Sequence, residues 1–163
     1  MAVPKEEADQ MAHQIQPRDG GFTYDTSTNR HHQGAGWAVA IPGHEERHPP
    51  GYEIARTHIQ HYEEAHRNFL AQKGVHLGGW HDPKTGVRTF DTSEIFTHRE
   101  LGRSAMVARG EDAMTNMTNF KSTRNKYKEA HAAGKISDAD YELMRAGGVS
   151  LESRYRDQSP AGS

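Results

Sequence analysis

The chain has 163 residues, and its 20 lysines and arginines against 22 aspartates and glutamates give a formal net charge of −2. This balance excludes a protein that is basic over its whole surface, as many nucleic-acid-binding proteins are, but it allows a local basic patch. The chain has no cysteine, which excludes disulfides, thiolate zinc sites and a thiol nucleophile.

The hydropathy of the chain predicts one modest core with polar ends. Mean hydropathy is −0.96, and no apolar run approaches the roughly 20 residues of a membrane-spanning helix. The start, MAVPKEEADQ, lacks the basic and apolar regions of a secretory signal. We therefore expect a protein that is neither secreted nor membrane-bound, with an N-terminal arm over residues 1–19 and a solvated tail over 149–163.

The first structured stretch begins at Gly20-Gly21. Strand-forming residues occur at 22–24 and again at 37–41, and turn-forming residues fill the interval between them, which predicts a hairpin with a long loop. Residues 44–51 contain Pro49-Pro50 and must be an extended connection.

The clearest helix is expected over residues 52–72. Its apolar residues recur at steps of three and four, and Gly74 follows where a helix commonly ends. Residues 75–80 then read as a strand, 81–86 as a turn, and 87–90 as a returning strand that continues through 96. Thr97 is a candidate N-cap with Glu100 three residues later, for a helix that ends at Arg109-Gly110.

Residues 111–119 fit either a strand or a helical turn, and 120–133 and 137–147 fit two short helices. The order β-β-α-β-β-α followed by an αα hairpin predicts an α+β fold: a small antiparallel-rich sheet with helices on one face, and flexible ends. The expected divisions are the arm 1–19, a core domain 20–119, a helical hairpin extension 120–148 and the tail 149–163.

The 12 histidines are dispersed, which argues against one dedicated metal cluster. His61 and His66 are five residues apart and therefore lie roughly 140° apart around a helix, so they cannot chelate one ion as a His-Glu-x-x-His pair does. His58 and His61 share a helix face and are weak metal candidates. Loop histidines such as His31 and His32 could serve a metal-assisted hydrolase with nearby acids, although polar loop residues are the simpler interpretation. We expect no cofactor.

Two further segments are candidate binding sites. Residues 121–135 carry five cations against Glu129 alone, a local excess of 5 − 1 = +4, and form the one segment expected to contact phosphates or an acidic partner: Lys121, Arg124, Lys126, Lys128 and Lys135. Gly78 and Gly79 precede Trp80, where a strand can bulge or another backbone can approach closely. No residue pattern indicates a catalytic nucleophile.

Three segments together resemble a known family. They are Gly20–Asp25 with Gly36–Ile41, Val75–Gly86 and Phe90–Ile95 with Arg99-Glu100, of which Gly-Gly-Trp-His-Asp-Pro-Lys-Thr-Gly is the most specific. Over about residues 20–119 they resemble an uncharacterised domain of actinobacterial phages and mobile elements, found also in large polyvalent proteins. The resemblance implies a biological setting but no catalytic residue.

From these observations we expect a phage-encoded, non-enzymatic interaction protein, a minor structural or decorating component of the virion that docks on other phage proteins. One alternative is an anti-defence or host-takeover factor that binds a host protein in the host cytoplasm. A second alternative is a small metal-assisted hydrolase that uses loop histidines.

Overall fold

The structure is a computed structural model that describes residues 2–147, and its internal contacts divide the chain into two compact units. Unit 1 comprises residues up to 33 and residues 43–93; unit 2 comprises residues 34–42 and those from 94 onward. The expected tail over 149–163, and the last residue of the expected hairpin extension, lie outside the described residues.

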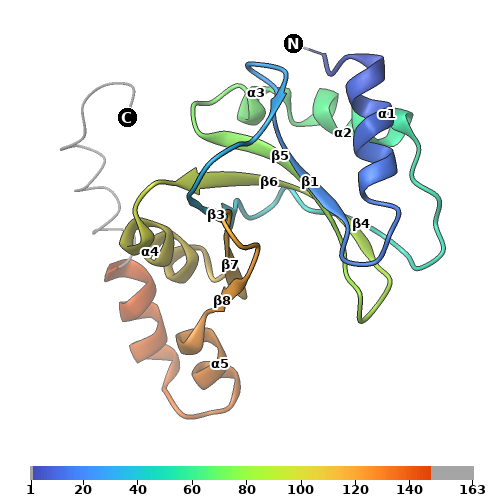
Figure 1. Cartoon of the computed structure of the whole chain (residues 1–163). Helices are drawn as coiled ribbons and strands as arrows, with labels where there is room; N and C mark the ends of the chain where they lie inside the picture. The colour runs from blue at the N-terminus through green and yellow to red at the C-terminus, as the bar shows by residue number, and fades with distance from the viewer. Residues whose placement is uncertain (1, 148–163) are drawn as a thin grey trace. The chain divides into compact units, whose positions relative to one another are not determined.

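Unit 1 is an antiparallel sheet with helices (Figure 1). The strands lie in the order β2-β1-β5-β6, and β4 also pairs with β6. Its elements in chain order are α1 (Lys5–Gln14), β1 (Gly21–Asp25), β2 (Arg30–His31), β4 (Glu46–His48), α2 (Arg56–Ala65), α3 (Arg67–Leu70), β5 (Val75–His81) and the larger part of β6 (Arg88–Phe96).

The core of unit 1 lies between one sheet face and the helices. Phe22 and Tyr24 are two residues apart on β1 and both are buried. Leu77 on β5 lies opposite Tyr24 in the antiparallel register. Side chains two apart on a strand share a face, so these residues turn together toward the apolar side of α1, where Met11 and Ile15 are fully buried. The N-terminal segment therefore differs from the expected arm, because its few apolar residues lie at helical spacing and complete this core.

Over the described residues 34–42 and 94–147, unit 2 combines further strands of the sheet with three helical segments. Its strand order is β6-β3-β7-β8, and β3 and β8 both pair antiparallel with β7. Its elements are β3 (Trp37–Ala40), the end of β6, α4 (Arg99–Arg109), β7 (Ala113–Asn116), β8 (Ser122–Arg124), α5 (Lys126–Ala132) and a helix over residues 138–147. Buried residues of β3, β6, α4 and β7 form its core, among them Val39, Phe96, Ala105 and Met114.

The predicted α+β class and its antiparallel sheet are confirmed, and so are several local features. The β5–β6 hairpin turns at residues 82–87, where the Asp82 carboxylate accepts from the Lys84 amide and Gly86 has a φ of +76°. Gly110 ends α4 in the left-handed conformation, and the Ser137 hydroxyl accepts from the Asp140 amide at the start of the last helix.

Three local predictions are wrong. Strands 22–24 and 37–41 do not pair with each other: β1 pairs with β2 and β5, and β3 pairs with β7. The helix expected over 52–72 begins at Arg56 and is interrupted at His66, which has a non-helical φ of −114°. The N-cap of α4 is His98 rather than Thr97, and no side chain caps it.

The expected helix over 120–133 is also shorter than predicted. Residues Ser122–Arg124 form β8 because they pair with β7, and α5 begins only at Lys126. Within residues 2–147, no helix is both long enough and apolar enough to cross a membrane.

Candidate functional site

A recess in unit 2 lies between α4 and the β8–α5 segment. It has a volume of about 240 Å³. Its lining comes from α4, β8 and the start of α5: Arg99, Arg103, Met106, Val107, Thr123, Arg124, Asn125, Lys126 and Tyr127. We call this the basic recess, because four of its lining residues are cationic and none is a carboxylate.

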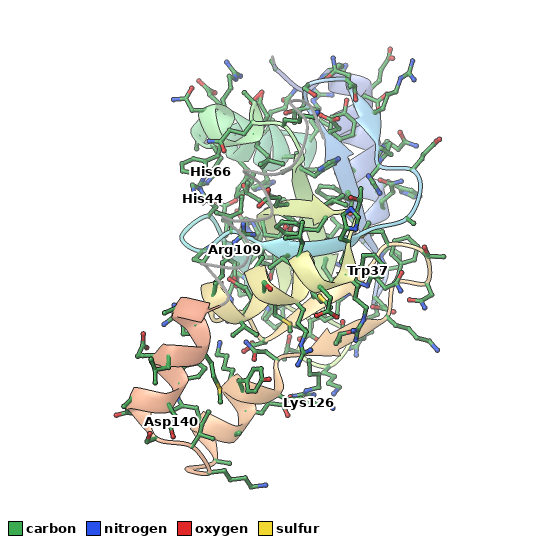
Figure 2. The ribbon with its side chains drawn as sticks, turned by 90° about the vertical axis from the view of Figure 1, so that its left-hand side faces the viewer. Trp37, His44, His66, Arg109, Lys126 and Asp140 are labelled. Carbon is green, nitrogen blue, oxygen red and sulfur yellow. The ribbon has the colours of Figure 1, made fainter. Side chains whose placement is uncertain are left out.

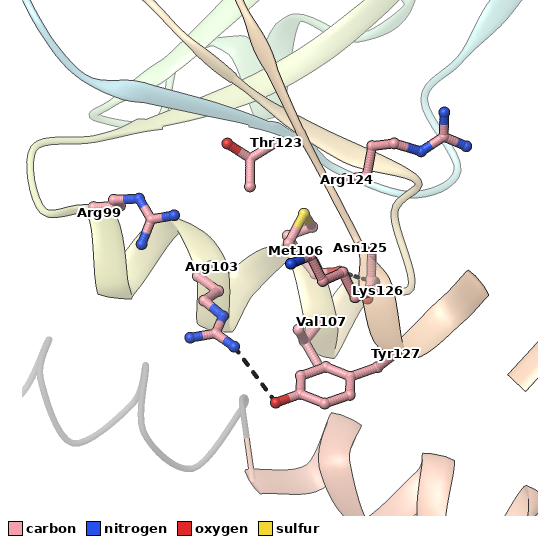
Figure 3. A pocket seen from close by; sticks show the side chains of 9 residues that line it. All are labelled: Arg99, Arg103, Met106, Val107, Thr123, Arg124, Asn125, Lys126 and Tyr127. Atoms are coloured by element: carbon pink, nitrogen blue, oxygen red, sulfur yellow. Dashed lines mark hydrogen bonds between the residues drawn. The ribbon is translucent and has the colours of Figure 1, made fainter. Parts of the chain in front are cut away.

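The helical spacing of α4 explains why two arginines meet here. Arg99 and Arg103 are four residues apart and therefore project from the same face of the helix, as Figure 3 shows. Met106 and Val107 follow on the same helix and are buried in the core of unit 2. The recess thus has an apolar base and a cationic rim.

Asn125 fixes the opposite wall of the recess. Its side chain is fully buried, and its Oδ1 accepts from the Lys128 amide at 3.1 Å as the N-cap of α5. Its Nδ2 donates to the carbonyl oxygens of Met106 at 3.4 Å and Glu111 at 3.0 Å. One amide side chain therefore ties the start of α5 to the end of α4.

Tyr127 and Arg103 close one side of the recess. Arg103 donates to the Tyr127 hydroxyl at 3.4 Å, and its guanidinium carbon lies 6.0 Å from the ring centroid. The ring also packs against the apolar core of unit 2. Arg103 is therefore held at one end by an aromatic side chain, which lowers the entropy lost when its guanidinium binds an anion.

The carboxylates nearest the recess belong to exposed ion pairs. Glu100 lies 3.5 Å from Arg99 and 3.9 Å from Arg103, and it is largely exposed; Glu129 pairs with Arg124. Exposed pairs contribute little to stability. An incoming carboxylate or phosphate can therefore exchange with these partners at small cost.

Only part of the basic segment predicted from sequence lines this recess. Arg124 and Lys126 do, whereas Lys128 forms an ion pair with Asp112 at 2.8 Å, and the hydrogen bond to Asp112 raises the pKa of Lys128. Lys121 and Lys135 are exposed and outside the lining. Sequence reasoning missed Arg99 and Arg103, although their spacing of four on a predicted helix was a usable signal.

Of the weak metal candidates on α2, His58 lies edge to face with the ring of His48, their centroids 5.8 Å apart. His58 accepts from the Ala55 amide through Nδ1 at 2.9 Å, so its neutral ring carries the proton on Nε2 and donates it to the Tyr52 hydroxyl at 3.1 Å. His61 is exposed. Among residues 2–147, no group of three or more potential ligands is placed to hold a metal ion.

Four further histidines of unit 1 lie in aromatic contacts: His31, His32, His44 and His66. His44 and His66 are hydrogen-bonded through their Nδ1 atoms at 2.8 Å, side by side in Figure 2, and His44 also packs on Phe69. Burial, and then the neighbouring His44, lower the pKa of His66. His32 contacts His76 edge to face, with ring centroids 5.3 Å apart. His31 packs instead against Tyr24.

Gly78, Gly79 and Trp80 have different roles on β5. A side chain at residue 79 would overlap the Phe22 ring, and one at residue 78 would overlap the Asp91 carboxylate. Trp80 is about half exposed, and its indole donates to the Asp19 carboxylate at 2.9 Å. The two glycines therefore allow close packing within unit 1.

Asp91 is the most perturbed carboxyl group of unit 1, and it was not singled out from sequence. Burial raises its pKa to about 6, against the lowering effect of a hydrogen bond from Ser93 Oγ at 3.0 Å. A carboxyl group with such a pKa is suited to proton transfer, and the hydroxyl within hydrogen-bond distance of it is that of Ser93. Nothing in a short strand pattern distinguishes such an aspartate from a solvated one.

Comparison of the chain with protein-family models, with curated proteins and with solved structures finds no match.

Proposed function

We propose that the chain is a non-enzymatic interaction protein that docks on an acidic segment of a partner protein through the basic recess. The observation that carries this proposal is the lining of the recess: Arg99, Arg103, Arg124 and Lys126 surround an apolar base, and no carboxylate or imidazole lines it. Such a lining can hold an anionic group but offers no acid–base pair for catalysis.

The size of the recess favours part of a macromolecule over a small substrate. Its volume of about 240 Å³ is below the range of about 300–1,000 Å³ in which pockets enclose a small molecule. A glutamate or aspartate side chain of a docked protein fits this space, and planar arginine side chains bind carboxylates in a bidentate manner.

The charges around the recess favour a protein partner over nucleic acid. Glu100 and Glu129 pair with the lining arginines, so the recess is bordered by charges of both signs, unlike the continuous basic surface that binds a nucleic-acid backbone. An acidic protein segment can place its carboxylates between those positions. Nucleic acid is an outcome that the experiment below distinguishes.

For the biological setting, we propose a phage particle, on the strength of the sequence resemblance alone. The partner is then another structural protein of the virion, and the chain is a minor or decorating component. Proteomics of density-purified particles tests this setting. Stoichiometric presence supports it, whereas absence redirects the proposal to a host protein in the host cytoplasm.

The binding proposal is tested by titrating the full chain with defined probes. We would follow amide NMR shifts with an acidic decapeptide in which glutamate alternates with serine, with a lysine decapeptide, and with a ten-nucleotide thymidine strand. We expect shifts around Arg103, Arg124 and Lys126 with the acidic peptide and none with the lysine peptide.

A pair of charge-reversal variants supplies the control. Arg103→Glu with Arg124→Glu should weaken peptide binding by about tenfold or more, whereas Lys73→Glu with Lys84→Glu changes the net charge equally on exposed residues of unit 1 and should have little effect. Equal weakening by both pairs, or tighter binding of the thymidine strand than of the peptide, would overturn the proposal.

A further inference from the structure

The tip of the β7–β8 hairpin presents an aromatic side chain that the fold does not need. Phe120 is 71% exposed, and its φ is +57°. This left-handed conformation is uncommon for any residue other than glycine, asparagine or aspartate, and it is a clear outlier for a bulky one. Both its exposure and its backbone are therefore unfavourable for a phenylalanine.

The hairpin tip is built by neighbouring residues and not by the phenyl ring. The Asn116 side chain accepts from the Thr118 amide at 2.9 Å, and the Asn119 side chain accepts from the Lys121 amide at 2.9 Å. The Phe120 amide donates to the Asn116 carbonyl at 2.7 Å, which any residue other than proline could do. Glycine or asparagine would suit this turn better. The phenyl ring is therefore explained by a contact with another molecule and not by the stability of the turn.

The position of Phe120 relative to the basic recess suggests that use. Lys121 follows it directly, and Arg124, at the end of β8, lines the recess. Four residues of extended chain span at most about 13 Å. One bound segment of a partner can therefore reach both the ring and the cations.

We propose that Phe120 is the apolar anchor of the docking surface, and that the partner segment is acidic and carries a bulky apolar side chain about four residues from its nearest carboxylate. This inference rests on the proposed function, since the cations supply the attraction that brings the segment to the hairpin. Aromatic side chains are frequent energetic centres of protein interfaces.

The test compares two acidic decapeptides that differ by one residue, leucine or alanine, four positions from a glutamate pair. Binding to the full chain is measured by fluorescence anisotropy with labelled peptides. We expect the leucine peptide to bind about tenfold more tightly than the alanine peptide. In Phe120→Gly this advantage should disappear, while affinity for the alanine peptide stays within about twofold.

Leu143→Ala is the matched control, because Leu143 is also 71% exposed and lies in unit 2. It should retain the advantage of the leucine peptide. The anchoring role of Phe120 is refuted if Phe120→Gly also retains the advantage of the leucine peptide, or if the unmodified chain binds both peptides equally. Binding of acidic segments at the basic recess is not refuted by either result. If neither peptide binds, the proposed function itself fails.

Thermal unfolding separates an anchor from a structural role. Phe120→Gly and Phe120→Asn should unfold at the same temperature as the unmodified chain or above it, because both residues accept a positive φ. A marked loss of stability in both variants would show that the ring supports the fold, and would overturn the inference. Tighter binding of the thymidine strand than of the leucine peptide, with loss in Phe120→Gly, would instead assign the ring to base stacking.

Discussion

The carboxylate of Asp91 occupies the space in which a side chain at Gly78 would lie. The two residues belong to the neighbouring strands β6 and β5, and the carboxylate is held there by the hydrogen bond from Ser93 Oγ at 3.0 Å. A glycine is thus required at residue 78 because a neighbouring carboxylate is packed over its backbone.

The first prediction is that Gly78→Ala lowers the free energy of unfolding by about 1–3 kcal/mol, because its methyl group displaces the Asp91 carboxylate from Ser93. Denaturant unfolding measures this change. Gly147→Ala is the control, since a side chain there meets no atom within 4 Å. In an Asp91→Ala background the cost of Gly78→Ala should shrink; an unchanged cost would place the clash elsewhere.

The β5–β6 hairpin shows what the sequence could predict. Its turn is specified locally by Asp82, Pro83 and Gly86, and the structure has that turn. The pairing of β1 with β5 joins residues that lie more than fifty positions apart, and no local pattern carries that information. For the same reason the basic recess could not be predicted from sequence, because Arg99 and Arg124 belong to separate elements and come together only in the fold.

Asp91 also predicts a pH dependence of stability. Its pKa is about 6 in the folded chain and its ordinary value is 3.8, so between about pH 4 and 6 the folded state binds more protons than the unfolded state. The contribution of this group therefore falls as the pH rises through that window. Asp91→Asn keeps an acceptor for Ser93 and removes the charge.

The Asn variant should be more stable than the unmodified chain at pH 7.5, by at most about 3 kcal/mol, and should lose this advantage by pH 4. Subtracting the two unfolding curves at each pH isolates Asp91 from the histidines, which titrate in both proteins. A stability difference that stays constant from pH 4 to 7.5 would contradict the raised pKa.

The His44–His66 pair predicts the opposite trend. Burial, and then His44, lower the pKa of His66, while Glu46 acts in the other direction. The unfolded chain therefore binds more protons than the folded chain just below about pH 6.5, and the contribution of His66 to stability falls as the pH falls. NMR titration of the imidazole gives its midpoint directly. His44→Gln should raise this midpoint toward 6.5, whereas His61→Gln, on an exposed position of the same unit, should leave it unchanged.

Asn125 predicts how firmly the recess is held. Replacing it with alanine removes the cap of α5 and leaves the carbonyl oxygens of Met106 and Glu111 without their donor, so the unfolding free energy should fall by about 1–3 kcal/mol. Asn125→Asp keeps the cap but not the donor, so its unfolding free energy should lie between those of Asn125→Ala and the unmodified chain. Asn68→Ala, at an exposed position of α3, is the control with little expected change.

Hydrogen exchange locates the effect: the Lys128 amide should exchange faster in Asn125→Ala but not in Asn125→Asp, because only the aspartate still accepts its hydrogen bond. Equal protection of that amide in all three proteins would show that α5 is held by its apolar contacts and not by the cap.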